Sequence, residues 1–118
     1  MTGLATASHA QTKARRPNIV FLLCDDLGYG DLACYGHPTI RTPRLDALAK
    51  EGVRLTDCYA AAPVCSPARA GIMAGRNPYR CRIPDWIPEN TGIHLHATEI
   101  SVAALLKSAG YRTAHCGK

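Results

Sequence analysis

The chain has 118 residues, 47% of them hydrophobic and 19% charged, which is enough for one modest core and one domain at most. Its formal charge of +5 favours an anionic partner, but the few aromatic residues form no stripe among the basic ones, so we expect no nucleic acid partner. No apolar run approaches the roughly eighteen residues that a membrane span needs, so none is expected.

Residues 1–16 are polar, lack hydrophobic periodicity and end in a basic pair, which predicts a flexible or processed tail. The stretch 8–11 resembles the cleavage site of a secretory signal, yet the apolar stretch that should precede it is missing. Either the natural start lies further upstream, or this is a simple tail. The first reading places the protein in the periplasm or outside the cell, and the second leaves it in the cytoplasm.

Residues 18–24 form a continuous apolar run, typical of a strand that is buried on both faces of a parallel sheet. The run stops at Asp25 and Asp26, after which Gly28 and Gly30 permit the backbone angles of a loop. The pattern therefore predicts two carboxylates at the carboxyl end of the first strand.

Residues 42–52 predict a helix, because Thr42 can cap it, Pro43 suits its first position and a glycine can end it. Alternation over residues 53–59 predicts a second strand, which a loop of small residues connects to Cys65.

A second helix is expected to start near Pro67, and a third to run from a Thr98 cap to Gly110. Residues 111–116 then begin another strand. The order strand, helix, strand, helix, helix, strand indicates an α/β fold with a mostly parallel central sheet. Because no covering helix follows the last strand, we expect the natural protein to continue past Lys118.

The six cysteines are widely scattered in a chain rich in aliphatic residues, so a disulfide scaffold is not expected. No pair has the C-x-x-C spacing of a zinc ribbon, and His94 with His96 is only a fragment of a ligand set.

The segment 65–76 combines a cysteine, a helix start and two arginines. Pro67 suits the first helical position and Ser66 its cap, so the unpaired N–H groups of the helix favour an anion close to Cys65. Arg69 follows about one turn later, and its guanidinium can hold the same anion by two hydrogen bonds. Together these residues predict an anion pocket.

The run Cys65-Ser66-Pro67-Ala68-Arg69, followed by Gly75-Arg76, resembles the sulfatase signature of Cys or Ser, any residue, Pro, any residue, Arg, and a later Gly-Arg. The resemblance continues through Asp25-Asp26-Leu27-Gly28, Thr42-Pro43 and Gly117-Lys118. The segments 35–38 and 85–90 look like those of bacterial arylsulfatases and of sulfatases acting on sulfated galactosamine or related glycans. Residues 17–118 then resemble the N-terminal part of a catalytic domain with the alkaline-phosphatase-like fold.

The resemblance implies that a formylglycine-generating enzyme oxidises Cys65 to Cα-formylglycine. It implies that Asp25 and Asp26, with the modified Cys65, bind one Ca²⁺ ion, Mg²⁺ being less favoured. Arg69 and Lys118 match the residues that contact the formylglycine and the sulfate. The remaining metal ligands and a catalytic histidine and lysine are expected beyond residue 118, so the isolated chain is expected to be inactive.

The chemistry explains why the thiol would be modified. Sulfur attack on a sulfate ester would leave an S-sulfonate with no easy release, whereas a hydrated aldehyde attacks with one hydroxyl and expels sulfate with the other. A hard cation would balance the charge of the sulfate. We therefore expect a hydrolase that releases sulfate from an aryl sulfate or a sulfated carbohydrate.

Two other functions remain open. A phosphate or phosphonate ester hydrolase of the same superfold would share the metal and nucleophile positions. A non-catalytic fragment could instead hold a sulfated glycan through its basic residues. Taken singly, Cys65 reads as an incidental thiol, the Asp25-Asp26 pair as a turn and Lys118 as a solvated side chain. Their combination favours the sulfatase.

Overall fold

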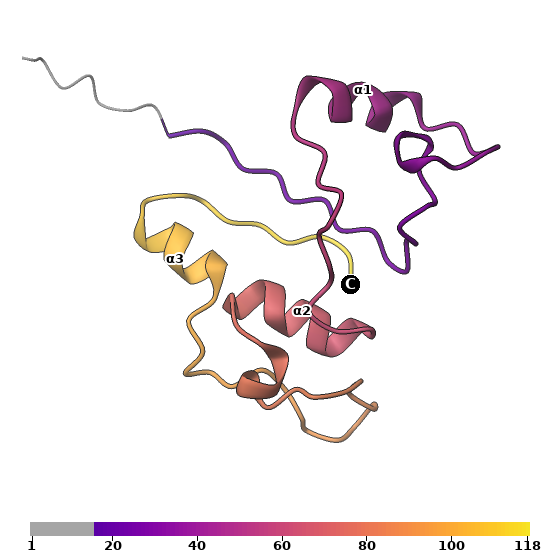
Figure 1. Ribbon diagram of the computed structural model, residues 1–118. Coiled ribbons are helices and arrows are strands. Elements are labelled where there is room, and N and C mark those ends of the chain that lie inside the picture. Colours follow the sequence, from indigo (N-terminus) through magenta and orange to yellow (C-terminus); the bar gives the residue numbers. More distant parts are fainter. Residues whose placement is uncertain (1–15) are drawn as a thin grey trace, which may run out of the picture.

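The computed structural model describes residues 16–118, and the stretch 8–11 lies outside that part. Short helices separated by long extended connections make up the described chain (Figure 1). None of these helices has the length and apolar character that crossing a membrane requires. In chain order the elements are η1 (Ala33–Tyr35), α1 (Pro43–Glu51), α2 (Cys65–Ala74), η2 (Pro78–Cys81) and α3 (Val102–Ser108).

Helix α1 confirms the prediction for residues 42–52, with Pro43 in its first turn and the amide of Gly52 bonded to the carbonyl of Leu48 at 2.9 Å. Thr42 precedes the helix, but its hydroxyl does not cap a helical amide. It donates to Asp46 at 2.9 Å and accepts from the amide of Ala33 at 3.0 Å. Thr42 therefore fastens η1 to α1.

The starts of the two other helices differ from the predicted ones. Helix α2 begins at Cys65 rather than near Pro67, because the amide of Ala68 already bonds to the carbonyl of the extended residue Val64 at 3.2 Å. Helix α3 is capped by Ser101, whose hydroxyl accepts from the amide of Ala104 at 3.1 Å. The predicted cap, Thr98, is bonded instead to a neighbouring histidine.

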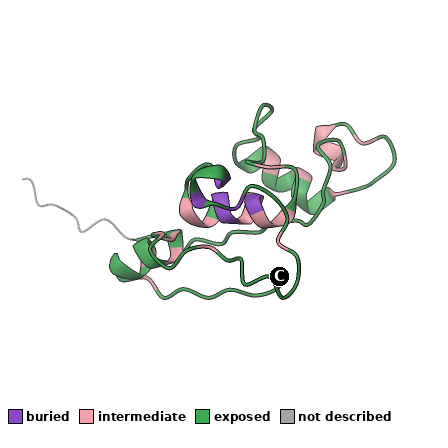
Figure 2. Ribbon diagram, turned by 90° about the horizontal axis from the view of Figure 1, so that it is seen from below, coloured by how far each residue is buried: buried purple, intermediate pink, exposed green. Residues whose placement is uncertain are grey.

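Buried side chains gather where α2 packs against η2 (Figure 2). Gly71 permits this close approach, since a Cβ there would lie 3.1 Å from the Cβ of Ala61 and 3.4 Å from Cγ of Pro78. The packed centre thus holds in place the helix that starts at Cys65. Its most deeply buried residues are Pro67, Ala70, Pro78, Cys81 and Ile83.

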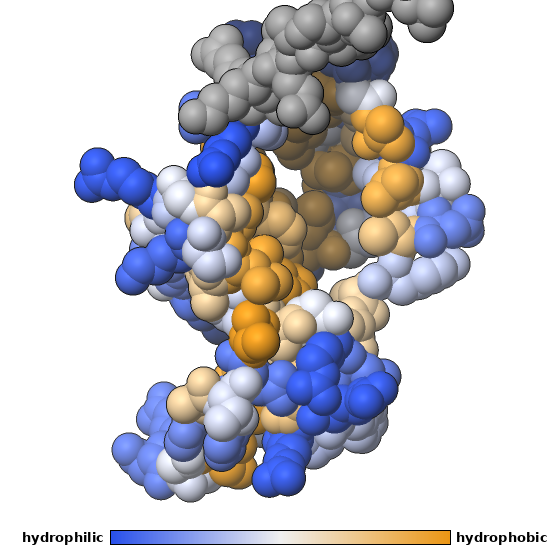
Figure 3. Space-filling view, turned by 90° about the vertical axis from the view of Figure 1, so that its left-hand side faces the viewer, coloured by the Kyte–Doolittle hydropathy of each residue, from blue (hydrophilic) through white to orange (hydrophobic). Residues whose placement is uncertain are grey.

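The structure does not confirm the three predicted strands, because none of residues 16–118 lies in a β-strand. The segments 18–24, 53–59 and 111–116 are extended, but a strand also needs backbone hydrogen bonds to a second extended segment, and none joins them within the described residues. Val20 and Leu22 are each 80% exposed instead of buried. One face of the molecule shows hydrophobic residues around a hollow (Figure 3).

The first and the last of these extended segments nevertheless run in the same direction, with contacts at both ends that join residues at the same sequence separation. Arg16 donates to the carbonyl of Ala109 at one end, and Lys118 pairs with Asp25 at the other. Both contacts join residues 93 positions apart. Segments 17–24 and 110–117 therefore run in parallel, as the indigo and yellow parts of the ribbon show (Figure 1).

Candidate functional site

Asp25 lies at the centre of the candidate site. Its Oδ1 accepts a hydrogen bond from Nη2 of Arg69 at 3.1 Å, and its Oδ2 accepts one from Nζ of Lys118 at 3.0 Å. A second nitrogen of the guanidinium, Nη1, donates to the main-chain oxygen of Lys118 at 3.2 Å. The structure thus brings together three predicted site residues from three distant parts of the chain.

The charges of this cluster stabilise one another. The hydrogen bond from Lys118, followed by that from Arg69, holds the pKa of the Asp25 carboxyl below its ordinary value of 3.8. The hydrogen bond to Asp25 and its negative charge raise the pKa of Lys118 above its ordinary value of 10.5. The shifts of Asp25 and Lys118 both favour the charged forms, so this pair is ionised at neutral pH.

Cys65 occupies the first residue of α2 and is half-buried. The amides of Cys65 and Ser66 precede the first helical hydrogen bond, and no side chain caps this end of the helix. These amides carry the partial positive charge of the helix terminus, which favours an anion beside Cys65. The predicted contribution of the helix end is present, although the helix starts two residues earlier than expected.

Ser66 has a role other than the predicted cap. Its hydroxyl accepts a hydrogen bond from the amide of Ile87 at 3.1 Å, which ties the segment 85–90 to the start of α2. The sequence pattern held no signal for this contact, because 21 residues separate the two partners. The segment that resembles a sulfatase loop therefore lies beside the candidate nucleophile.

Asp26 follows the cluster but has no polar contact among residues 16–118. Its backbone is left-handed, with φ of 58°, a conformation that a non-glycine residue holds only at a cost. Such local strain is often found at functional sites.

The carboxylates of Asp25 and Asp26 are suitable ligands for a divalent cation, but two carboxylates are too few to enclose one. Ionised carboxylate oxygens are the donors that hard cations prefer, and Asp25 is kept ionised by its partners. The part of the chain described here holds no group of three or more acidic, histidine or cysteine side chains that could enclose a metal ion. Asp25 and Asp26 can therefore supply only part of a ligand set.

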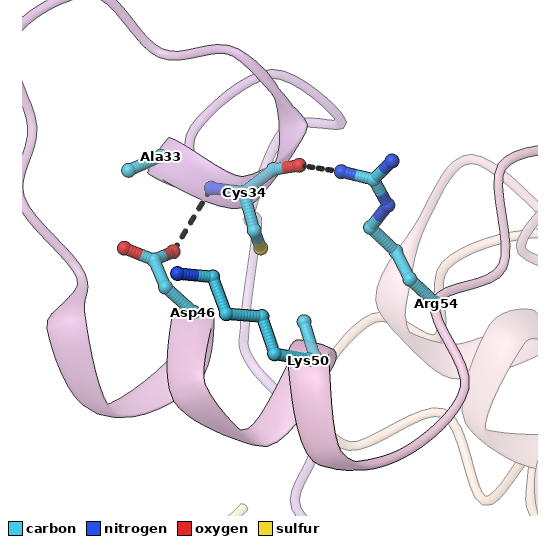
Figure 4. A pocket seen from close by; sticks show the side chains of 6 residues that line it. Ala33, Cys34, Asp46, Lys50 and Arg54 are labelled. Atoms are coloured by element: carbon cyan, nitrogen blue, oxygen red, sulfur yellow. Dashed lines mark hydrogen bonds between the residues drawn. The ribbon is translucent and has the colours of Figure 1, made fainter.

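A separate cavity of about 500 Å³ lies between η1 and α1 and contains none of the predicted site residues. Asp46 accepts from the amide of Cys34 at 2.9 Å, and Arg54 donates to the carbonyl of Cys34 (Figure 4). The polar groups around this cavity hold η1 against α1. None of the residues that line the cavity belongs to the cluster around Asp25.

Comparisons with known proteins identify the family to which these residues belong. The sulfatase family model matches residues 17–118. Human steryl-sulfatase is 48% identical over 119 residues, which cover 94% of this chain and 20% of that protein. Arylsulfatase H of Canis lupus familiaris is 47% identical (91% and 20% covered), and human arylsulfatase A is 46% identical (89% and 21% covered).

The chain belongs to the sulfatase family. It spans about a fifth of the length of the curated relatives it matches. The family generally uses formylglycine and a divalent metal, and it implies the alkaline-phosphatase-like α/β fold. The relatives are named for steryl and aryl sulfates.

Proposed function

We propose that the protein hydrolyses sulfuric esters and releases inorganic sulfate from an aryl sulfate or a sulfated carbohydrate. The observation that carries this proposal is the cluster at the start of α2. Arg69 and Lys118 converge there on Asp25, beside a helix end that begins at Cys65. Two cations and two free amides make this the place in the described chain best suited to an anionic sulfate group.

In this proposal Cys65 is the nucleophile position and is converted to formylglycine. The modified side chain would supply a hydrated aldehyde, one hydroxyl of which attacks sulfur and expels the alcohol of the ester. The other hydroxyl then loses its proton, and the carbonyl re-forms as inorganic sulfate leaves. Arg69 contacts the modified residue and the sulfate from one turn further along α2. Lys118 approaches from the end of the extended segment 110–117 and stays protonated, because Asp25 raises its pKa.

Asp25 and Asp26 are proposed as two ligands of one Ca²⁺ ion, with the modified residue 65 as a third. The bound cation would neutralise negative charge on the sulfate group and so favour attack on its sulfur atom by the modified residue 65. Carboxylate oxygens suit Ca²⁺ and Mg²⁺ alike, and the looser geometry that Ca²⁺ accepts favours it where two adjacent residues both contribute.

The proposed partners are a sulfated small molecule or glycan and a formylglycine-generating enzyme that acts on Cys65 during maturation. A periplasmic or secreted location is proposed with them. Cell fractionation followed by detection of the protein would check the location, and recovery in the cytoplasm alone would contradict it.

The test compares 4-nitrophenyl sulfate with 4-nitrophenyl phosphate as substrates of the purified natural protein, and determines the state of Cys65 by mass spectrometry. We expect sulfate turnover, and a peptide whose mass is lowered by formylglycine and which resists thiol alkylation. Cys65→Ala should abolish turnover, while Cys58→Ala, a change at a different cysteine that is exposed, should preserve it.

Each other outcome points to a different function. Dominant phosphatase activity would identify the phosphate or phosphonate hydrolase of the same superfold. A free thiol at Cys65 in protein that binds sulfated glycan but turns over nothing would identify the non-catalytic binding module.

A further inference from the structure

A second ion pair lies at the opposite end of α2 from Cys65. Nη1 of Arg76 is 2.6 Å from Oε2 of Glu99. The Glu99 side chain is only 12% exposed, whereas that of Arg76 is 43% exposed. The carboxylate is thus largely removed from water and depends on Arg76 for its compensation.

The two residues belong to parts of the chain that carry different members of the candidate site. Arg76 directly follows Gly75, the left-handed residue that ends the helix bearing Cys65 and Arg69. Glu99 precedes α3, which leads into the extended segment that ends at Lys118.

The segment 99–118 is therefore fastened to α2 at both ends. Arg76 holds Glu99 at the C-terminal end of the helix, and Arg69 holds the main chain of Lys118 near its N-terminal end. Between these points α3 also packs against α2. Loss of the Arg76–Glu99 contact would leave only the packing of α3 on α2 and the exposed contacts around Asp25 to set the position of Lys118.

We propose that Arg76 and Glu99 are positioning residues, which set the placement of Lys118 relative to Asp25 and to the start of α2. They touch neither Cys65 nor the ion-pair cluster, and they act through α2 and α3. The expected change in kcat rests on the proposed function. The expected change in the position of Lys118 does not depend on any activity.

The geometric test is carbodiimide cross-linking of Asp25 to Lys118 in the purified natural protein, quantified by mass spectrometry. The two groups are 3.0 Å apart, so they should form an amide readily in the wild type. Because bond formation depends steeply on placement, Glu99→Gln and Arg76→Gln should lower the yield by about threefold or more. Arg76→Lys retains the positive charge and should restore most of it.

The kinetic test uses the same variants with an aryl sulfate. Displacement of Lys118 should lower kcat by about tenfold or more with a smaller change in KM. Arg76→Gln should be more severe than Glu99→Gln, because it leaves the covered carboxylate without its partner. Arg80→Gln is the matched control, since Arg80 is exposed, lies close by and has no ion pair among residues 16–118.

The results separate the two proposals. A wild type without sulfate turnover refutes the proposed function, and the cross-link yield still decides the positioning role. Unchanged cross-linking in both Gln variants overturns that role, as does an equal loss of kcat in Arg80→Gln. All assays run well below the melting temperature of each variant, so that a general loss of stability cannot imitate the effect.

Discussion

Asp25 and Lys118 are 93 residues apart in sequence, yet their side chains meet at 3.0 Å. This contact joins the ends of two parallel extended segments, and Arg69 of α2 shares the same carboxylate. The sequence motifs singled out these three residues as candidate site residues. Only the folded structure shows that the Asp25 carboxylate binds both Lys118 and Arg69.

The pairing of Asp25 can be tested by titration. Removing the ammonium with Lys118→Gln should raise the pKa of Asp25 toward 3.8, and Arg69→Gln should raise it by less, because the Lys118 hydrogen bond is the larger cause of the shift. The carbon chemical shift of the carboxyl group, followed by NMR against pH, measures both. If neither variant changed the pKa of Asp25 measurably, the ion pairs would be contradicted.

The sign of the linked effect on stability follows from that shift. The folded-state pKa of Asp25 is lowered, so its contribution is fully present above the ordinary value of 3.8 and is lost as the pH falls through the lower folded value. Acid unfolding monitored by circular dichroism should therefore begin at higher pH in Lys118→Gln than in the wild type.

The proposed metal role predicts a dependence of stability on Ca²⁺. A ligand present at one hundred times its dissociation constant stabilises the folded state by about 2.7 kcal/mol. Adding Ca²⁺ to chelator-treated natural protein should therefore raise its melting temperature, and Asp26→Asn should weaken the rise. Asp57→Asn alters an exposed aspartate whose side chain, within residues 16–118, is bonded only to Thr56, and it should leave the rise intact. A full response in Asp26→Asn would remove that residue from the ligand set.

The packed contact between α2 and η2 predicts a strong effect at Ile83, which is 1% exposed. Ile83→Ala should lower the free energy of unfolding by about 2–5 kcal/mol, since it leaves a cavity beside the helix that carries Cys65. Ile72→Ala, at a 38% exposed position of α2, should cost less than about 1 kcal/mol. Urea denaturation of the two variants gives the comparison.

The start of α3 offers a test between the predicted and the observed cap. Ser101→Ala should destabilise the protein by about 1 kcal/mol, because it removes the acceptor for the amide of Ala104. Thr98→Ala should change stability by no more than about 0.5 kcal/mol. A larger loss for Thr98→Ala than for Ser101→Ala in thermal denaturation would reverse the assignment.

Local signals in the sequence predicted what depends on local interactions. Helix α1 follows from Pro43 and a closing glycine, and α2 lies within the signature run, because helical hydrogen bonds need only neighbours along the chain. The family agrees with the motifs. Asp25, Arg69 and Lys118, which the motifs singled out, lie together in the structure, and their functional roles stay a prediction. The exact starts of helices were missed, since more than one residue could serve as a cap.

Long-range partners could not be predicted from the pattern. The apolar runs predicted strands, and the structure has extended segments at those places without the backbone hydrogen bonds to a second segment that a strand requires, as far as residues 16–118 show. The contacts of Ser66 with Ile87 and of Arg76 with Glu99 join residues more than 20 positions apart, where composition and spacing carry no information.

The equal separation of the two contacts that bracket segments 17–24 and 110–117 has a consequence for how this protein tolerates changes in length. Removing one residue from either segment would shift one contact by a single position and turn its side chain to the opposite side, since neighbours in an extended chain alternate. Insertions outside both segments, in the exposed loops of residues 26–108, would leave that matching intact. Length is therefore fixed most strictly where the chain has the least regular structure.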